Sequence, residues 1–271
     1  MWFRILVKAL KRNGWRQLFF YLGNLDVWRF IEYSTVYRLV KEKKGIGRTI
    51  DLGAGYSVFP SLFPGEDYTI VDLGEGACEY QGAHGTKAIV QDMTCLPFKT
   101  SSVDTVLAIS SIEHVPDDCA VFSEISRVLS QHGIAVVSIP HTNEKTEVRP
   151  LTYPKWMKRI LYNYDKFWQS ILGKTHFTYF IEQTSTDSII RFYNLPELRS
   201  ILETYKLEIK HYDLFGKQLS RTFFRFIPSG WFILKDIFFG WPLHELEKIF
   251  LQNSNVADGM ILLLEKKIDE I

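Results

Sequence analysis

Residues 50–60 read IDLGAGYSVFP, in which a short apolar run ends at an acid and then breaks into glycines. The stretch before the break, residues 47–52, is short and rich in β-favouring side chains. Gly53 and Gly55 therefore fall where a buried strand passes into a loop. A glycine loop after a strand brings the backbone close to a bound ligand. The stretch thus predicts a ligand-binding loop at the end of a strand.

The surrounding sequence, from residue 47 to residue 139, alternates short apolar runs with turn or helix signals. Residues 117–130 place apolar side chains at helical spacing, and Asp117 and Asp118 suit the start of that helix. This alternation predicts an α/β fold with a doubly wound sheet, whose ligand crevice lies at the carboxyl ends of the strands. The expected strands are residues 48–52, 68–72, 88–91, 103–109 and 133–139.

The pattern changes after residue 140, because residues 143–190 are polar and aromatic and predict an inserted helical cap. We expect residues 1–46 to form an N-terminal basic helical arm and residues 47–271 to form one domain. This domain carries two expected insertions, at about 143–193 and at about 215–256. The remaining expected elements are a helix over 195–205 and strands over 206–214 and 259–265.

Three classes of ligand bind to glycine loops of this kind, and the loop sequence distinguishes them. A phosphate-binding loop ends in Lys-Ser/Thr, and no such pair follows Gly55. The dinucleotide fingerprint GxGxxG requires a third glycine at position 58, which is Val58. What remains is an acid at the strand end followed by GxG, here residues 51–55. This pattern resembles the first motif of the class I S-adenosylmethionine-dependent methyltransferases.

Further blocks follow in the order found in that family. Asp72 closes the second expected strand 21 residues after Asp51, and Asp92 lies in the segment QDMTCLPF. The stretch VDTVLAISSIEHV (103–115) is similar to the family's FDxVxxxxxxEHV block. The stretch EISRVLSQHGIAVVSIP (124–140) is similar to its ExxRVLKPGGxxxxSxP block. Over residues 48–140 the chain therefore resembles the type 11 small-molecule methyltransferases.

The resemblance implies a Rossmann-like sheet of seven strands, the last of them antiparallel, and S-adenosylmethionine as the cofactor. Asp72 would accept hydrogen bonds from the ribose hydroxyls, and Asp92 would receive the adenine amino group. Met93 would cap the edge of the adenine. No metal ion is expected, because an electrophilic methyl group mainly needs donor and acceptor held in line. The implied cofactor-binding residues are Asp51, Gly53, Ala54, Gly55, Asp72, Leu73, Asp92, Met93 and Ser110.

The chain departs from the family pattern at three places. Ser57 replaces the third glycine of the first motif, and the bulky Tyr56 precedes it. Residues 73–87 are rich in glycine and do not predict an evident helix. Residues 131–133, Gln-His-Gly, stand where the family has Pro-Gly. These departures bear on the detailed geometry of the cofactor site and leave its general position unchanged.

The candidate catalytic residues follow from the position of the crevice. Methylation of a hydroxyl is helped by a general base, and histidine is the most frequent one. His114 lies just past the fourth expected strand and is the first candidate. Glu113 could orient it or face the cofactor, and His141, directly after the fifth expected strand, is the second candidate base.

The composition of the chain indicates the kind of cellular compartment in which the protein works. Cys78, Cys95 and Cys119 have an odd count and no CxxC spacing, so we expect neither a disulfide framework nor a zinc site. A reducing compartment is the default for such a chain, and we expect a cytoplasmic location. The sequence has no apolar segment of about 18 residues that would predict a transmembrane helix. Residues 1–15 carry charge throughout, which argues against a signal peptide.

Two segments suggest an anionic membrane surface as a partner, on the inner face of a membrane. Residues 1–48 hold 11 Lys/Arg against 3 Asp/Glu, and the first ten residues form a basic amphipathic pattern. The same pattern also suits a helix that is docked on the protein's own core. Residues 222–250 concentrate tryptophan and phenylalanine and are too charged to span a membrane. This second segment could be a substrate lid, a membrane contact or a homodimer interface. We do not expect nucleic-acid binding, because the basic arm has no recognition motif.

The sequence therefore predicts an enzyme that transfers a methyl group from S-adenosylmethionine to a small or lipid-linked acceptor, at oxygen. The preference for oxygen rests on the histidines alone. Two alternatives stay open: a non-catalytic, membrane-associated scaffold that binds S-adenosylmethionine, and a nicotinamide-dependent oxidoreductase, which Val58 and the Asp92 segment disfavour. The insertions, which would build the acceptor pocket, contain no motif that names the acceptor.

Overall fold

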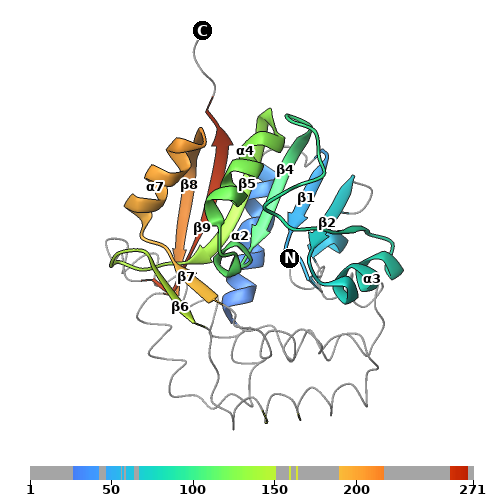
Figure 1. Cartoon of the computed structure of the whole chain (residues 1–271), viewed down its shortest axis with the longest axis horizontal. Helices are drawn as coiled ribbons and strands as arrows, with labels where there is room; N and C mark the ends of the chain where they lie inside the picture. Colours follow the sequence, from blue (N-terminus) through green and yellow to red (C-terminus); the bar gives the residue numbers. More distant parts are fainter. Residues whose placement is uncertain are drawn as a thin grey trace.

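A seven-stranded sheet forms the centre of the protein, with the strand order β3-β2-β1-β4-β5-β9-β8 (Figure 1). The computed structural model describes residues 27–42, 47–55, 57, 59–63, 67–150, 159, 163, 189–216 and 257–267. Strands β1 to β5 run parallel, and β9 is antiparallel to both β5 and β8. The predicted α/β sheet with an antiparallel last strand is therefore confirmed. The strands are β1 (Thr49–Leu52), β2 (Tyr68–Asp72), β3 (Lys87–Val90), β4 (Val103–Ile109), β5 (Leu129–Pro140), β8 (Leu207–Phe215) and β9 (Gly259–Lys266).

The chain reverses its direction of travel across the sheet between β1 and β4. From β1 it moves outward through β2 to β3, and it then returns to β4 on the other side of β1. In open α/β sheets, ligands bind outside the carboxyl ends of the strands at such a switch point. The topology therefore places the expected crevice beside the ends of β1 and β4.

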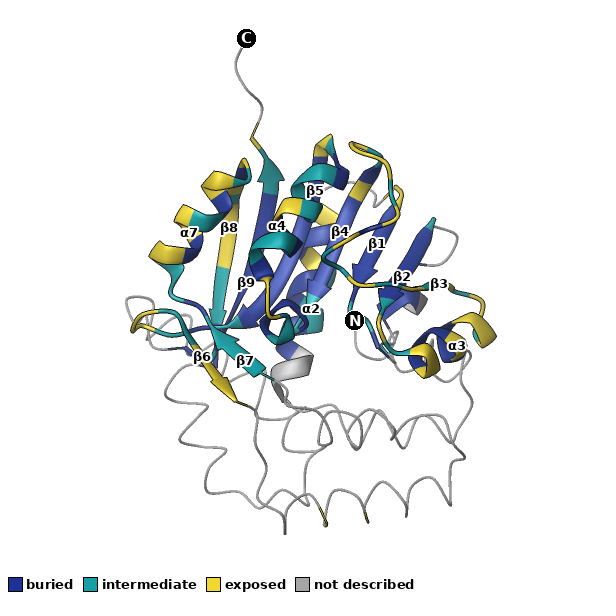
Figure 2. Cartoon of the chain, in the orientation of Figure 1, coloured by how far each residue is buried: buried dark blue, intermediate teal, exposed yellow. Residues whose placement is uncertain are grey.

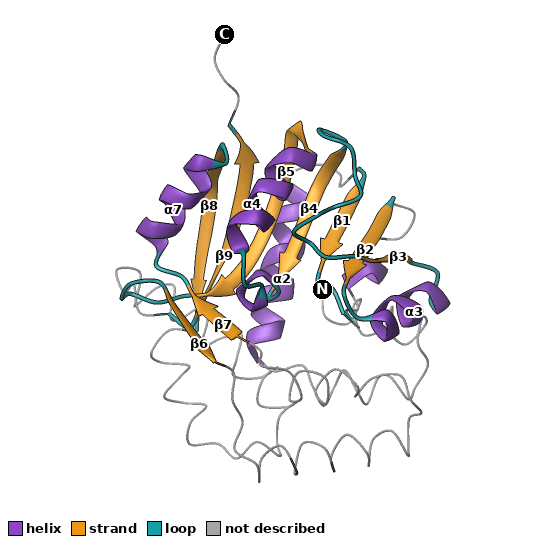
Figure 3. Cartoon of the chain, viewed as in Figure 1, coloured by secondary structure: helices purple, strands orange, loops and turns teal. Residues whose placement is uncertain are grey.

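Helices cover both faces of the sheet, as Figure 3 shows: α4 (Asp118–Val128) and α7 (Leu195–Thr204) lie on one face, and α2 (Val27–Glu42) lies on the other. Successive side chains of a strand point to opposite faces. In β4, Val106 and Ala108 accordingly belong to the core under α4 and α7, whereas Leu107 belongs to the core under α2. The central strands are buried, and the edge strands β3 and β8 are more exposed (Figure 2).

Helix α2 belongs to the segment that the sequence assigns to an N-terminal arm. It packs on the sheet through four buried apolar side chains, together with the short helix η1 (Phe59–Leu62). Residues 1–26 lie outside the described residues, and the domain boundary at residue 46 stays a prediction. Among the described helices, none combines the length and the apolar character needed to cross a membrane. The four buried side chains of α2 are Ile31, Val36, Leu39 and Val40.

The segment after Asp72 corrects one expectation. It contains helix α3 (Glu75–Ala83), although its glycines did not predict an evident helix. The helix forms because Ala77, Cys78, Tyr80 and Gln81 share one buried face against β2 and β3. Tertiary packing of one face outweighs the weak intrinsic propensity of such a sequence.

The two ends of the first insertion correct another expectation. In place of a helical cap that begins at residue 143, β6 (Glu147–Pro150) and β7 (Ile189–Phe192) pair as an antiparallel two-stranded sheet. We call this pair the β6–β7 ribbon. Apart from Arg159 and Asn163, residues 151–188 lie outside the described residues, as do residues 217–256 of the second expected insertion. The aromatic segment 222–250 is part of that range, so its expected roles stay predictions.

Candidate active site

The glycine loop leaves the end of β1 with a backbone that requires glycine. Gly53 has φ +67° and Gly55 has φ +53°, which is the left-handed region that other residues rarely adopt. A Cβ atom on Gly53 would lie 2.6 Å from the Cβ of Ser111 and 3.2 Å from the Cε of Met93. No described atom lies within 4 Å of the corresponding position on Gly55. Three segments therefore converge on Gly53, while the described residues leave the side of Gly55 open.

Asp72, at the end of β2, ties the glycine loop to the next loop. Its Oδ2 accepts a hydrogen bond from the Gly55 amide (2.8 Å), and its Oδ1 accepts one from the Gly74 amide (2.8 Å). A carboxylate offers about four acceptor positions, so both oxygens can still receive ribose hydroxyls. Leu73, the next residue, is 69% exposed and presents an apolar side chain beside this carboxylate.

Gln81 of α3 supports the same loop and was not found from the sequence. It is fully buried, and its Nε2 donates to the Gly55 carbonyl (3.0 Å) and to the Ser57 carbonyl (2.9 Å). An amide on the apolar face of a helix needs such partners, because burial without them is costly. The position of Gln81 among buried apolar residues is the sequence signal that could have found it.

The loop after β3 carries the two expected adenine contacts, Asp92 and Met93. Asp92 is exposed, and its Oδ1 accepts hydrogen bonds from the amide and the hydroxyl of Thr94, both at 2.8 Å. Met93 is half-buried and reaches over Gly53. The structure therefore brings Met93 to the glycine loop and leaves Asp92 exposed.

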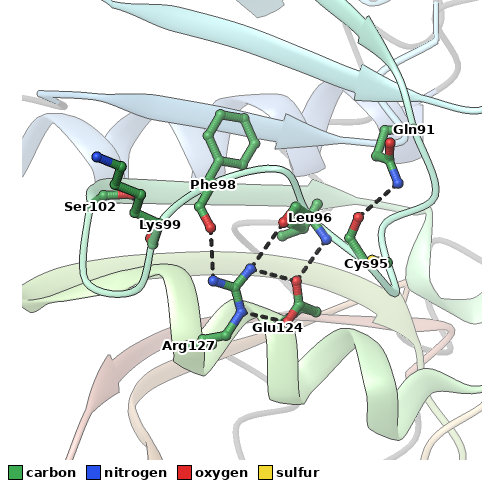
Figure 4. A network of polar contacts seen from close by, with 8 residues as sticks. All are labelled: Gln91, Cys95, Leu96, Phe98, Lys99, Ser102, Glu124 and Arg127. Carbon is green, nitrogen blue, oxygen red and sulfur yellow. Dashed lines mark hydrogen bonds and ion pairs between the residues drawn. The ribbon is translucent and has the colours of Figure 1, made fainter.

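Glu124 and Arg127 of α4 hold the part of this loop that follows Met93 (Figure 4). Glu124 accepts a hydrogen bond from the Leu96 amide (2.7 Å), and Arg127 donates to the carbonyls of Leu96 (3.0 Å) and Phe98 (2.8 Å). The two side chains also pair with each other at 2.6 Å. The hydrogen bonds from Arg127 hold the pKa of Glu124 below its usual value. The acid and the arginine of the ExxRVL block thus fasten a crevice loop to a helix.

We expect Arg127→Ala to lower the unfolding free energy by about 2 kcal/mol, because it removes charge-assisted hydrogen bonds at a partly buried site. It should also weaken S-adenosylhomocysteine binding about tenfold, or about 1.4 kcal/mol, since the loop with Met93 loses its anchor. Thermal unfolding and calorimetric titration measure the two effects. Arg48→Ala is the control, because its ion pair with Asp67 (3.2 Å) is half exposed and worth less than about 1 kcal/mol. Equal losses in the two variants would contradict the anchoring role.

Ser110, directly after β4, is held by a residue that the sequence did not suggest. Its φ is +48°, an uncommon backbone conformation for serine, and its hydroxyl donates to Glu32 Oε1 of α2 at 2.6 Å. Ser138 of β5 donates to the same oxygen, and Glu32 is 2% exposed. The carboxylate of α2 thus joins the ends of β4 and β5. Glu32 shares a helical stripe with Val36 and Val40, so an acid on an apolar face was the available signal.

Ser111 is a third residue that sequence reasoning missed, after Gln81 and Glu32. It is 7% exposed, and its Oγ has no hydrogen-bond partner among the described residues. An unpartnered buried hydroxyl is rare in a folded protein and needs an explanation. The Oγ lies 3.3 Å from the Cβ position on Gly53, beside the glycine loop. A polar group of a bound ligand would satisfy it there.

Asp51 lies behind the crevice. It is 1% exposed, and its Oδ2 accepts a hydrogen bond from the Tyr68 hydroxyl at 2.6 Å. Burial raises the pKa of this carboxyl from 3.8 to about 7, although the Tyr68 hydrogen bond partly opposes the shift. Burial disfavours the charged form of the acid, so a nearby cationic ligand group would favour its ionisation.

The raised pKa of Asp51 predicts a pH-dependent stability. Between pH 4 and pH 7 the unfolded chain has lost this proton and the folded chain still holds it, so stability falls as the pH rises. The full effect is on the order of 4 kcal/mol at about 1.4 kcal/mol per pKa unit. Asp51→Asn should therefore unfold at about the wild-type temperature at pH 4 and at a higher temperature at pH 8. A difference that stays constant over this range in thermal unfolding would contradict the raised pKa.

His114 lies in the short helix η2 (Ile112–His114), between the sheet and the β6–β7 ribbon. Its Nδ1 lies 2.8 Å from the Ile189 carbonyl oxygen, and its Nε2 lies 4.0 Å from Glu113 Oε1. A carbonyl can only accept, so Nδ1 carries the proton and Nε2 is the basic nitrogen of the neutral ring. Glu113 is buried at 3% exposure.

His141, the other candidate base, is 7% exposed at the end of β5. Its Nδ1 lies 3.2 Å from the Tyr193 carbonyl oxygen, and its Nε2 lies 3.2 Å from Asn143 Oδ1. Both ring nitrogens thus face acceptor oxygens of the protein. This arrangement suits a residue that fastens β5 to β7 better than one that receives a substrate proton.

Comparison with known proteins gives a family match for part of the chain. Residues 50–137 match the sequence model of a family described as "Methyltransferase domain". No curated protein sequence matches the chain. The matched residues run from β1 to β5 and contain the glycine loop, Asp72, Asp92 and His114.

Many solved structures share the fold at low sequence identity. A methyltransferase from Archaeoglobus fulgidus that depends on S-adenosylmethionine shares 15% identity (TM-score 0.53, 96% of this chain, 98% of that one). The 1,6-didemethyltoxoflavin-N1-methyltransferase of Burkholderia thailandensis, solved with S-adenosylhomocysteine, shares 12% sequence identity with a TM-score of 0.53. The match covers 98% of this chain and 89% of that one. The geranyl diphosphate C-methyltransferase of Streptomyces coelicolor A3(2), also solved with S-adenosylhomocysteine, shares 12% sequence identity with a TM-score of 0.51. The match covers 86% of this chain and 77% of that one. At these identities the likeness shows the fold alone.

The residues at the crevice fit the cofactor that the family implies. Within the described part of the chain, Gly55 has open space beside it and the Oγ of Ser111 has no hydrogen-bond partner. Asp72 keeps acceptor positions for further hydrogen bonds. Gly53, Gly55, Asp72 and Ser111 would hold the cofactor, and Met93 would cover it. The family match over residues 50–137, the sheet order and the residues around the glycine loop together support a class I methyltransferase domain with S-adenosylmethionine as its cofactor.

Proposed function

We propose that the protein methylates an oxygen atom of a small or lipid-linked acceptor, with Nε2 of His114 as the general base. The observation that carries this proposal is the hydrogen bond from His114 Nδ1 to the Ile189 carbonyl (2.8 Å), because it leaves the basic nitrogen on the other side of the ring. The position of η2 just after β4, at the switch point, supports the same role.

The chain's own residues have three tasks in this reaction. The loop around Gly53 and Gly55 and the carboxylate of Asp72 bind the cofactor, which supplies an electrophilic methyl group when bound. Nε2 of His114 would remove the proton from the acceptor hydroxyl as that oxygen receives the methyl group from the cofactor. Glu113, 4.0 Å away, favours the protonated ring that results. The proton then leaves to solvent from the same nitrogen.

The lipid-linked alternative for the acceptor rests on the sequence. Residues 1–10 form a basic amphipathic pattern, and residues 222–250 are rich in tryptophan and phenylalanine. Apolar segments of this kind suit an entrance for an apolar acceptor or a contact with an anionic membrane. The atom that is methylated differs among proteins of this fold, since those from Burkholderia and Streptomyces are named as N1- and C-methyltransferases.

The test incubates the purified protein and an extract of its own cells with S-adenosylmethionine that carries a labelled methyl group. Label that partitions into the organic phase supports a lipid-linked acceptor, and label in the aqueous phase supports a small soluble one. Mass spectrometry of the product then shows whether the methyl group sits on oxygen. Methylation on nitrogen or carbon would overturn the oxygen assignment, and label equal to that of a protein-free blank would overturn the proposed acceptor classes.

A further inference from the structure

Strand β7 is fixed to the rest of the protein at three points, and two of them involve the segment that carries His114. At its start, the Ile189 carbonyl accepts the hydrogen bond from His114 Nδ1. Just beyond its end, Tyr193 is fully buried, and its backbone pairs with Pro140 and Thr142 at 3.0 Å each. Between these points lies Arg191. The strand thus spans from the end of β5 to η2.

Arg191 points away from the ribbon and binds the turn that follows His114. Its Nη2 donates to the Pro116 carbonyl (2.9 Å), and its Nη1 donates to the Val115 carbonyl (3.2 Å). The same Nη1 lies 2.9 Å from Asp118 Oδ1, at the first turn of α4. The side chains of Arg191 and Asp118 are only 12% and 10% exposed. A charged guanidinium in such a place is held by its hydrogen bonds, and it fixes what it binds.

We propose that Arg191 is a positioning residue for His114. By binding the carbonyls of residues 115 and 116 and the carboxylate of Asp118, it keeps β7 against η2. The Ile189 carbonyl then stays within reach of His114 Nδ1 and sets the tautomer of the ring. The importance of this tautomer for catalysis rests on the proposed function, but the positioning itself can be measured without an acceptor.

Pairing within the β6–β7 ribbon does not by itself hold the Ile189 carbonyl against His114. Pairing with β6 holds β7 along its whole length, including Ile189 opposite Pro150, but β6 is exposed and belongs to the same ribbon. Tyr193 holds only the far end of β7, four residues from Ile189. Without Arg191, β7 would keep its pairing with β6 and the histidine hydrogen bond, but it would lose both hydrogen bonds to the turn that follows His114. Arg191 therefore holds β7 near η2 independently of the histidine hydrogen bond. The Ile189 carbonyl needs such support if it is to set the tautomer of His114.

The test is an NMR measurement of the His114 ring in the full-length protein labelled with ¹⁵N at histidine. Long-range ¹H–¹⁵N correlation spectra at a pH where the ring is neutral distinguish the two tautomers, and a His114→Asn variant identifies the His114 signals by their absence. The wild type should show a ring with its proton on Nδ1. Arg191→Ala should show nitrogen shifts intermediate between the two tautomers. Arg191→Lys, which can keep the ion pair with Asp118 and lose the paired carbonyl contacts, should lie between wild type and Arg191→Ala.

Arg149→Ala is the matched control. It removes a guanidinium from the other strand of the same ribbon, where Arg149 pairs with Glu147 on the surface and lies 4.7 Å from the Phe192 ring. This variant should leave the His114 signals unchanged. Thermal unfolding of every variant shows that the compared proteins are folded, and Arg191→Lys carries the test if Arg191→Ala does not fold.

The outcomes distinguish the positioning role of Arg191 from the assignment of His114 as the base. A pure Nδ1–H tautomer in folded Arg191→Ala, or in Arg191→Lys if only that variant folds, would overturn the positioning role and leave the base assignment intact. A wild-type ring with its proton on Nε2 would contradict the base assignment of His114 and the tautomer-setting role of Ile189 together. Equal shifts in Arg149→Ala would show a general effect of ribbon loosening and would also overturn the specific role of Arg191.

Discussion

Gly53→Arg should abolish cofactor binding, with S-adenosylhomocysteine affinity reduced at least about a hundredfold, or about 2.7 kcal/mol. The position has φ +67°, and a Cβ atom there would lie 2.6 Å from the Cβ of Ser111. The arginine side chain would have to displace Ser111 or enter the space where the three loops converge. Calorimetric titration with S-adenosylhomocysteine measures the loss.

Two further variants make this result interpretable. Gly82→Arg adds the same side chain at an exposed position of α3, where no described atom lies within 4 Å of the new Cβ, and it should bind the cofactor normally. Gly55→Ala is the milder change in the loop itself. Its φ of +53° costs about 1–2 kcal/mol for alanine, but no described atom meets the methyl group. If Gly55→Ala is folded and binds S-adenosylhomocysteine more weakly, the loss comes from the binding site and not from misfolding. Unchanged affinity in both loop variants would contradict the role of the glycine loop in cofactor binding.

His114→Asn should lower turnover by about 10²–10⁴-fold, the usual contribution of general acid–base catalysis. Asparagine can still donate an amide hydrogen toward the Ile189 carbonyl, but it has no basic nitrogen in place of Nε2. The affinity for S-adenosylhomocysteine should stay within about twofold, or about 0.4 kcal/mol, because Gly53, Asp72 and Ser111 are untouched. The rate is measured on the acceptor fraction that the labelling experiment identifies.

The matched control is His132→Asn, at an exposed position near the start of β5. It should turn over at the wild-type rate. If His114→Asn also does so, the histidine does not act as the base, and methyl transfer proceeds by positioning alone. If His114→Asn loses cofactor binding together with turnover, the residue belongs to the binding site instead.

The parallel part of the sheet could be predicted from the sequence because its strands are buried apolar runs with sharp ends. The expected strands 68–72 and 103–109 coincide with β2 and β4. The last parallel strand was expected from residue 133, whereas β5 begins at Leu129. It begins early because α4 ends at Val128 and Leu129 already pairs with Val103, ahead of an irregular register. The local sequence pattern contains no signal for a pairing between residues so far apart in the chain.

The elements that were missed depend on partners far away in the sequence. Strand β6 is polar and exposed, and it forms because β7 pairs with it. Helix α3 is held by one buried face and not by its propensity. The same reason applies to Glu32, Gln81 and Ser111, whose roles appear only when α2, α3 and η2 meet the ends of the strands. The motif residues Gly53, Gly55 and Asp72 could be placed, because their roles follow from local backbone geometry.

The most direct test of the account is amide hydrogen exchange with and without S-adenosylhomocysteine. The cofactor should slow exchange in the glycine loop at 53–55, around Asp72 and Gly74, in the loop 92–94 and at 110–112. The distant β8 should be unchanged. Bound cofactor, shown by calorimetry, with no protection in these four segments would contradict the placement of the site.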